Sequence, residues 1–284
     1  MTSRIAMAFA KAAQHRRAAY APFLMAGFPN WETFSRLLKE LDNLSCDIVE
    51  VGVPAPCAPL DGPAIQKAGN IALGNGATIE TVLTTIESAS PRVAAPIVLM
   101  TYYDVVSGMP MKEFCKRVKK AGMSGVIIPD VPENLAVEWK IAANALGIDT
   151  IFLVNPSMRS SEIQSIARLS TGFVYFRTTT RQTGAKVIVA EELLSILAHV
   201  KRLSSIPVAA GFGIASSEQT RLLAQVADGV IVGSALVQKI LDAHNENDAV
   251  NSVLGFSKEI LAASRKCAKS SPLRMHCDAS VGRE

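Results

Sequence analysis

The stretch Ile48–Pro63 reads I-V-E-V-G-V-P-A-P-C-A-P-L-D-G-P and contains two acidic residues among apolar and proline residues. Four of its first six residues are β-branched and apolar, which predicts a buried strand over 48–53. Glu50 lies inside this strand, where an unpaired carboxylate is costly to bury. Asp61 follows after a proline-rich loop, directly before Gly62-Pro63 and a helical pattern. We therefore expect two acids that face one cavity.

Outward from this stretch, short apolar strands alternate with amphipathic helices along the whole chain. We expect strands over 20–27, 48–53, 95–103, 125–129, 149–154, 172–177, 206–210 and 229–232. We expect helices within 1–17 and over 31–44, 64–73, 78–89, 111–121, 134–146, 160–169, 190–203, 217–226, 235–243 and 249–263, with Asn30 as a cap. The strands are continuous apolar runs, which is typical of a parallel sheet buried on both faces. Eight such units predict an α/β fold, a single-domain (β/α)8 TIM barrel with an N-terminal helix. The alternative is an open doubly wound sheet.

The amino-acid composition is typical of a globular protein with a large apolar core. The 284 residues are 49% hydrophobic and 19% charged, with a net charge of +4. We expect one barrel domain over 1–264 and a polar, flexible tail over 265–284. The five cysteines match neither a zinc site nor a redox pair, and no apolar run is long enough for a membrane span. The sequence therefore predicts a cytoplasmic protein without a metal, a nucleic-acid partner or a membrane partner.

The two acids have a functional and a structural interpretation. In such barrels the site lies at the C-terminal ends of the strands, where two carboxyls in different environments can divide acid and base roles. The structural alternative is that Glu50 satisfies a buried backbone or hydroxyl group and that Asp61 caps the helix at Pro63. We favour the functional interpretation for Glu50, because a buried, unpaired glutamate is uncommon.

Glycines and aromatic residues gather near the same strand ends. Glycines follow the last three strands at Gly184, Gly211-Phe212-Gly213 and Gly233-Ser234, where N–H groups and a helix start favour a phosphate group. Turn glycines are the alternative. Apolar rings near these ends predict a pocket for a flat apolar substrate, or simply core packing. They are Phe23, Tyr102, Tyr103, Tyr175 and Phe212.

From about Ala21 to Ile240 the chain resembles the α subunit family of tryptophan synthase. The motifs that carry the resemblance are P-F-L-M-A-G-F-P at 22–29, V-E-V-G-V-P at 49–54, L-D-G-P-A-I-Q at 60–66, L-M-T-Y-Y at 99–103, G-V-I-I-P-D-V-P at 125–132, G-F-V-Y-F at 172–176, T-G-A at 183–185, G-F-G-I at 211–214 and A-D-G-V-I-V-G-S-A at 227–235. The resemblance implies a lyase of tryptophan biosynthesis. The family cleaves indole-3-glycerol phosphate to indole and glyceraldehyde 3-phosphate without a cofactor, in a retro-aldol reaction.

The resemblance also implies a role for each candidate residue. Glu50 matches the acid/base that protonates the indole ring, and Asp61 the acid that stabilises the charge at the indole nitrogen. Substrate contacts are implied for Phe23, Tyr102, Tyr175, Thr183 and Phe212. The phosphate group is expected on Gly184, Gly213, Gly233 and Ser234.

Two loops depart from the family pattern. After the second strand the family usually reads F-S-D-P-x-A-D-G-P, whereas Ala55–Leu60 keeps neither F-S-D-P nor its acid, which Cys57 replaces. After the sixth strand it usually reads S-R-x-G-V-T-G, and Thr178–Gln182 differs from it. In the family these loops close over the substrate and communicate with the β subunit of an αββα complex. We therefore expect weaker coupling to a β subunit, or a different partner. The functional alternatives are a stand-alone indole-producing lyase and a weakly active paralogue that acts as a binding or regulatory subunit.

Overall fold

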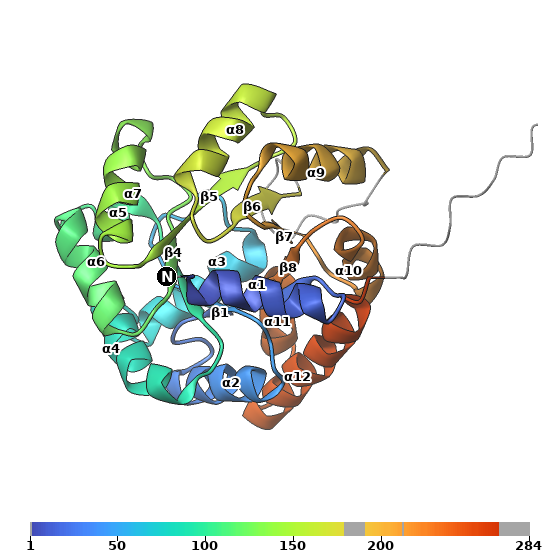
Figure 1. The fold of residues 1–284 in the computed structure, drawn as a ribbon. Coiled ribbons are helices and arrows are strands. Elements are labelled where there is room, and N and C mark those ends of the chain that lie inside the picture. The colour runs from blue at the N-terminus through green and yellow to red at the C-terminus, as the bar shows by residue number, and fades with distance from the viewer. Residues whose placement is uncertain (1, 179–190, 212, 267–284) are drawn as a thin grey trace, which may run out of the picture.

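A closed barrel of parallel strands forms the centre of the molecule (Figure 1). The computed structural model describes residues 2–178, 191–211 and 213–266. The strands follow one another around the barrel in sequence order: β1 (Ala19–Met25), β2 (Val49–Gly52), β3 (Ile97–Met100), β4 (Gly125–Ile127), β5 (Asp149–Val154), β6 (Val174–Arg177), β7 (Val208–Gly211) and β8 (Gly229–Val232). Because β1 pairs with β8, the barrel is closed. The predicted (β/α)8 barrel is confirmed and the open sheet is excluded.

Helices surround the barrel and connect its strands (Figure 1). They are α1 (Arg4–Gln14), α2 (Trp31–Asn43), α3 (Pro63–Gly74), α4 (Ile79–Ala89), η1 (Ser90–Arg92), α5 (Tyr103–Val106), α6 (Met111–Lys120), η2 (Glu133–Leu135), α7 (Ala136–Asn144), α8 (Ser160–Leu169), α9 (Glu191–Leu203), α10 (Ser217–Ala224), α11 (Ser234–Leu241) and α12 (Glu246–Ala263). The predicted cap of α2 is confirmed, since the Asn30 side chain accepts a hydrogen bond from the Thr33 N–H at 2.8 Å. None of the described helices is long and apolar enough to cross a bilayer.

The segment after β3 differs from the prediction. The strand expected over 95–103 ends at Met100, and Tyr103 begins the short helix α5. The Tyr103 N–H donates to Asp130 Oδ1 at 2.8 Å, so an acid from the loop after β4 satisfies a group that opens this helix. The apolar pattern of the segment fits a strand as well as a helix, and this distant contact favours the helix.

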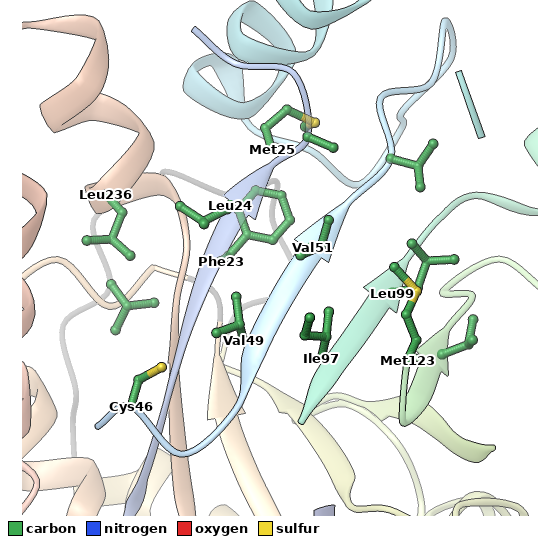
Figure 2. Close-up of a cluster of buried hydrophobic side chains, with 14 of the residues drawn as sticks. Phe23, Leu24, Met25, Cys46, Val49, Val51, Ile97, Leu99, Met123 and Leu236 are labelled. Atoms are coloured by element: carbon green, nitrogen blue, oxygen red, sulfur yellow. The ribbon is translucent and has the colours of Figure 1, made fainter. Parts of the chain in front are cut away.

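Side chains on each strand point alternately to the layer between strands and helices and to the interior of the barrel. Val49 and Val51 of β2, with Ile97 and Leu99 of β3, belong to the apolar layer between strands and helices (Figure 2). The residues in between point into the barrel, and Ile48 and Val98 belong to the inner apolar cluster there. Glu50 is in phase with Ile48 and therefore belongs to the inner side. A strand buried on both faces explains the continuous apolar runs of the sequence.

Helix α1 closes the N-terminal end of the barrel (Figure 1). Ile5, Phe9 and Ala12 are buried in the inner cluster, and the Phe9 ring lies 5.5 Å from the ring of Phe173. Because this end is filled by apolar side chains, space for a ligand inside the barrel remains at the C-terminal ends of the strands.

The tail that we predict from residue 265 is described only at its start. The Lys266 N–H donates to the Arg16 carbonyl at 2.8 Å, and Arg265 pairs with Arg17 in an isolated antiparallel bridge. Residues 267–284 lie outside the described part of the chain. The division into a barrel domain over 1–264 and a flexible tail therefore stays a prediction.

Candidate active site

A cavity opens among the C-terminal ends of the strands. Its lining residues come from both sides of the barrel: Phe23, Glu50, Asp61, Ile65, Met100, Tyr175, Gly213, Ile231, Gly233 and Ser234. The structure thus brings together most of the residues that the sequence singles out, including both acids.

Glu50 is held on the inner side of β2 between Phe23 of β1 and Val98 of β3, its register partners. The side chain is 5% exposed, and no described residue forms a hydrogen bond with its Oε2 atom. This absence argues against a purely structural role for that oxygen. Burial, and then the nearby Asp61 carboxyl, raise the pKa of Glu50 to about 8. At pH 7 Glu50 is therefore mostly protonated and suited to donate a proton to a group in the cavity.

Asp61 has a different environment. Its Oδ1 accepts a hydrogen bond from the Tyr102 hydroxyl at 2.9 Å, and the same hydroxyl accepts from the Leu60 N–H at 3.2 Å. Burial raises the pKa of Asp61 to about 6, and the bond from Tyr102 opposes that rise. Asp61 is therefore mostly ionised at pH 7. The two neighbouring acids divide into a proton donor and an anion, as the functional interpretation requires.

The capping alternative for Asp61 is wrong. Gly62 is the N-cap residue of α3, and no side chain caps this helix end. Pro63 occupies the first turn as predicted, where its missing N–H has no intrahelical partner to lose. The Asp61 side chain points instead to Tyr102, and its backbone carbonyl accepts from Gln66 Nε2 at 3.0 Å.

Tyr102 lies behind Asp61 and is absent from the lining of the cavity. Its side chain is 2% exposed, and its described hydrogen bonds link Asp61 to Leu60. The direct substrate contact that we expect for Tyr102 therefore stays a prediction. The structure gives this residue a second task, because its hydroxyl orients the Asp61 carboxylate.

Two glycines make room for the aromatic walls of the cavity. A Cβ atom at Gly52 would lie 2.5 Å from Cζ of Phe23, on the adjacent strand. A Cβ atom at Gly211 of β7 would likewise collide with the ring and hydroxyl of Tyr175 on β6. These distances are shorter than van der Waals contact, so both rings keep their places only because the opposing residue has no side chain.

Substitution of Gly52 by alanine tests this packing. We expect Gly52→Ala to displace the Phe23 ring, to weaken indole binding and to lower Tm by several degrees, because overpacking costs about 1–3 kcal/mol. Indole titration and thermal unfolding measure the two effects. Gly74→Ala is the matched control, since the added Cβ would meet no other part of the described structure within 4 Å beyond its chain neighbours and its own helix backbone. Equal behaviour of the two variants would contradict the packing account.

The opposite side of the cavity suits an anion. Gly213 adopts φ +81°, which favours glycine, and Gly233 is the N-cap of α11 with Ser234 as the first helical residue. N–H groups in the first turn of a helix have no intrahelical acceptor, and the helix dipole adds positive potential there. Thr183, Gly184 and Phe212 lie outside the described residues, so their expected contacts stay predictions.

Three apolar lining residues are additions to the predicted site: Ile65, Met100 and Ile231. Met100 and Ile231 are inner strand positions, and both belong to the inner apolar cluster. Strand alternation extended from Val98 to Met100 would have found the first of them. Ile65 lies in the first turn of α3, four residues after Asp61, and only the path of the loop places it in the wall.

Comparison with known proteins agrees with this geometry. A family model described as tryptophan synthase alpha chain matches residues 9–265. The tryptophan synthase alpha chain of Gloeobacter violaceus is 37% identical over 263 residues, which are 92% of this chain and 95% of that protein. That of Geotalea daltonii is also 37% identical, over 83% of this chain and 89% of its own length.

Solved structures give the same result. A chain of tryptophan synthase from Mycobacterium tuberculosis superposes with a TM-score of 0.85 at 32% identity, covering 93% of this chain and 99% of that one. Tryptophan synthase subunit alpha from Legionella pneumophila reaches 0.84 at 25% identity, over 93% and 98%. With matches along almost its full length, the chain belongs to the tryptophan synthase alpha chain family of lyases.

Proposed function

We propose that the described cavity cleaves indole-3-glycerol phosphate to indole and glyceraldehyde 3-phosphate, with Glu50 and Asp61 as the catalytic residues. The observation that carries this assignment is the pair itself. Two buried acids face one cavity, one mostly protonated and the other mostly ionised at neutral pH. A retro-aldol cleavage needs one group to give a proton and another to stabilise positive charge, and this pair supplies both.

The reaction begins with proton transfer from the Glu50 carboxyl to C3 of the indole ring. The ring then carries a positive charge that extends to its nitrogen, and the Asp61 carboxylate stabilises this charge. The bond between C3 and the side chain breaks as the adjacent side-chain hydroxyl loses its proton and becomes the aldehyde. The electron pair of that bond returns to the ring, and the proton lost by the hydroxyl restores the Glu50 carboxyl, so that no net proton is consumed. No oxidant, reductant or water is consumed.

The walls of the cavity fit the two halves of this substrate. Apolar side chains surround the acids on the Phe23 side and suit a flat indole ring. The phosphate group is assigned to Gly213 and to the N-terminus of α11 at Gly233 and Ser234. The substrate would then extend across the cavity, with its reacting carbon beside Glu50.

The divided acid pair predicts a bell-shaped dependence of kcat/KM on pH, which reports the free enzyme. Activity should fall below about pH 6 as Asp61 gains a proton, and above about pH 8 as Glu50 loses one. The maximum is expected near pH 7. Steady-state assays of indole release between pH 5 and 10 measure both limbs. A profile that rises steadily through pH 9 would contradict the role of protonated Glu50.

Tyr102→Phe provides the control for the acidic limb. The substituted ring no longer donates the hydrogen bond that holds down the pKa of Asp61, so the acidic limb should move to higher pH. The substrate phosphate also titrates near pH 6, but it does so identically for both proteins. A shift between native enzyme and variant therefore belongs to the enzyme.

A tryptophan synthase β chain is the proposed partner, with weaker coupling than in the family. The proposal rests on the sequence of Ala55–Leu60, which lacks the family's F-S-D-P motif beside the catalytic Asp61. We expect that adding the β chain of a relative changes the rate of indole release by less than about tenfold, because loop closure on partner binding usually sets such activation. A much larger increase would contradict weak coupling.

A cytoplasmic location remains part of the proposal, in keeping with the free thiols of Cys46, Cys57 and Cys115.

A further inference from the structure

The strands of the barrel contain three charged residues: Glu50, Asp149 and Arg177. Asp149 begins β5 and therefore lies toward the end of the barrel that α1 closes. Arg177 is the last residue of β6 and lies at the opposite end, where the cavity opens. It is the single basic residue in the eight strands. A cation at such a position is costly to desolvate and calls for an explanation.

Strand alternation places Arg177 on the inner side of the barrel, beyond Tyr175, which lines the cavity; Arg177 itself is not one of the lining residues. Phe173 and Tyr175 belong to the inner apolar cluster, and Arg177 is in phase with them, one step above Tyr175. The register is fixed by its pairing with Gly211 of β7 and by the hydrogen bond from the Thr178 N–H to the Gly211 carbonyl at 3.0 Å. The guanidinium is half-buried and lies near Tyr175 and Tyr102, the two tyrosines next to the acid pair. Arginine keeps its charge in such surroundings.

The positive charge of Arg177 can offset the negative charges that meet in and around the cavity. Glu50 and Asp61 are the ionisable acids among its lining residues, and the proposed substrate adds a phosphate of about −1.5 to −2 charges. An anion close to a carboxylate is repelled in a site of low dielectric constant. The N–H groups around Gly213 and α11 offset part of this cost as dipoles, without a net charge.

The register of β6 and β7 brings Arg177 to the side of the barrel where the phosphate position is proposed. Its partner Gly211 is two residues before Gly213, and neighbouring strands lie about 4.8 Å apart, within the reach of an arginine side chain. A planar guanidinium also matches the oxygens of a phosphate group with paired hydrogen bonds.

We propose that Arg177 is a specificity-determining residue that binds the phosphate end of the substrate, together with Gly213 and the N-terminus of α11. The inference rests on the proposed function and refines it. Arg177 selects phosphorylated over unphosphorylated indole-glycerol, while the indole half is recognised without it.

Binding of glycerol 3-phosphate and of indole, each measured separately by calorimetry, tests the two halves of the site. We expect Arg177→Met to raise the Kd of glycerol 3-phosphate about 10- to 100-fold, the usual range for loss of a charge-assisted hydrogen bond. The Kd of indole should stay within about twofold. The affinity of the native protein for glycerol 3-phosphate should also fall more steeply with salt than that of the variant.

Two further variants make the result decisive. Arg168→Met removes the same charge from the exposed last turn of α8, and it should leave both Kd values unchanged. Arg177→Lys keeps the charge and should bind glycerol 3-phosphate more tightly than Arg177→Met. It also serves as the test if the methionine variant does not fold.

The inference is overturned if Arg177→Met binds glycerol 3-phosphate like Arg168→Met, or if indole and glycerol 3-phosphate lose affinity equally. Failure of the proposed function has a different signature, because the native chain would then release no indole from indole-3-glycerol phosphate. Native cleavage with unchanged phosphate affinity in Arg177→Met would remove the inference alone.

Discussion

Glu50→Gln is expected to lower kcat for indole-3-glycerol phosphate cleavage by at least about 10²-fold, with little change in KM. Glutamine keeps the size of the side chain but has no acidic proton to give to the indole ring, and general acid catalysis contributes about 10²–10⁴-fold. Binding of indole should persist, because the apolar walls around Phe23 are unchanged. The measurement is steady-state release of indole at pH 7, where Glu50 is mostly protonated.

Thermal unfolding at two pH values tests whether this variant is folded and whether Glu50 is buried in its neutral form. Burial raises the pKa of Glu50 from 4.5 to about 8, so the folded protein holds this proton more tightly than the unfolded chain between those values. The contribution of Glu50 to the free energy of unfolding is therefore fully present below about pH 4.5, and it is lost as the pH rises through about 8. The loss is on the order of 5 kcal/mol, because each pKa unit corresponds to about 1.36 kcal/mol. Glutamine does not titrate, so Tm of Glu50→Gln should depend less on pH. Identical profiles for both proteins would contradict a buried, neutral Glu50.

Asp61→Asn is expected to lower kcat by about 10²–10³-fold, the usual cost of removing one group that stabilises transition-state charge. Asparagine can still accept the hydrogen bond from Tyr102, so the loop keeps its described contact while the negative charge disappears. The positive charge on the indole ring then lacks its counter-charge. Indole release and the Kd of indole measure the two consequences, and we expect only the first to change strongly.

Asp104→Asn is the matched control for this prediction. It makes the same chemical change at an exposed residue of α5, outside the lining of the cavity. Its kcat should stay within about twofold of the native value. The assigned role of Asp61 would be wrong if both variants had native activity, or if Asp61→Asn lost indole affinity in proportion to its rate.

The barrel itself follows from local sequence patterns. Continuous apolar runs such as Ile97–Met100 are distinctive, because most residues of a strand buried on both faces are apolar. The inner position of Glu50 is seen in the structure, where Glu50 is in phase with Ile48 of the inner apolar cluster. The end of β3 is different, since it depends on a contact between Tyr103 at the start of α5 and Asp130, which lies 27 residues later in the loop after β4.

The sequence indicates which residues form the candidate site, but it indicates much less about the contacts between them. Strand ends are gathered at one face of a barrel, so Glu50, Asp61 and the phosphate glycines were expected together. The bond between Tyr102 and Asp61 spans 41 residues and depends on the path of the loop after β2. The fit of Phe23 against Gly52 depends on side-chain packing between strands, which local patterns do not specify.

The most direct test of the central claim is cleavage of indole-3-glycerol phosphate in deuterium oxide, followed by mass and NMR analysis of the indole released. Glu50 exchanges its acidic proton with solvent, so native enzyme should release indole with one deuterium at C3, together with an equal amount of glyceraldehyde 3-phosphate. Glu50→Gln should release the same product at least about 10²-fold more slowly. Indole without deuterium at C3, no indole at all, or an unchanged rate in Glu50→Gln would contradict the account.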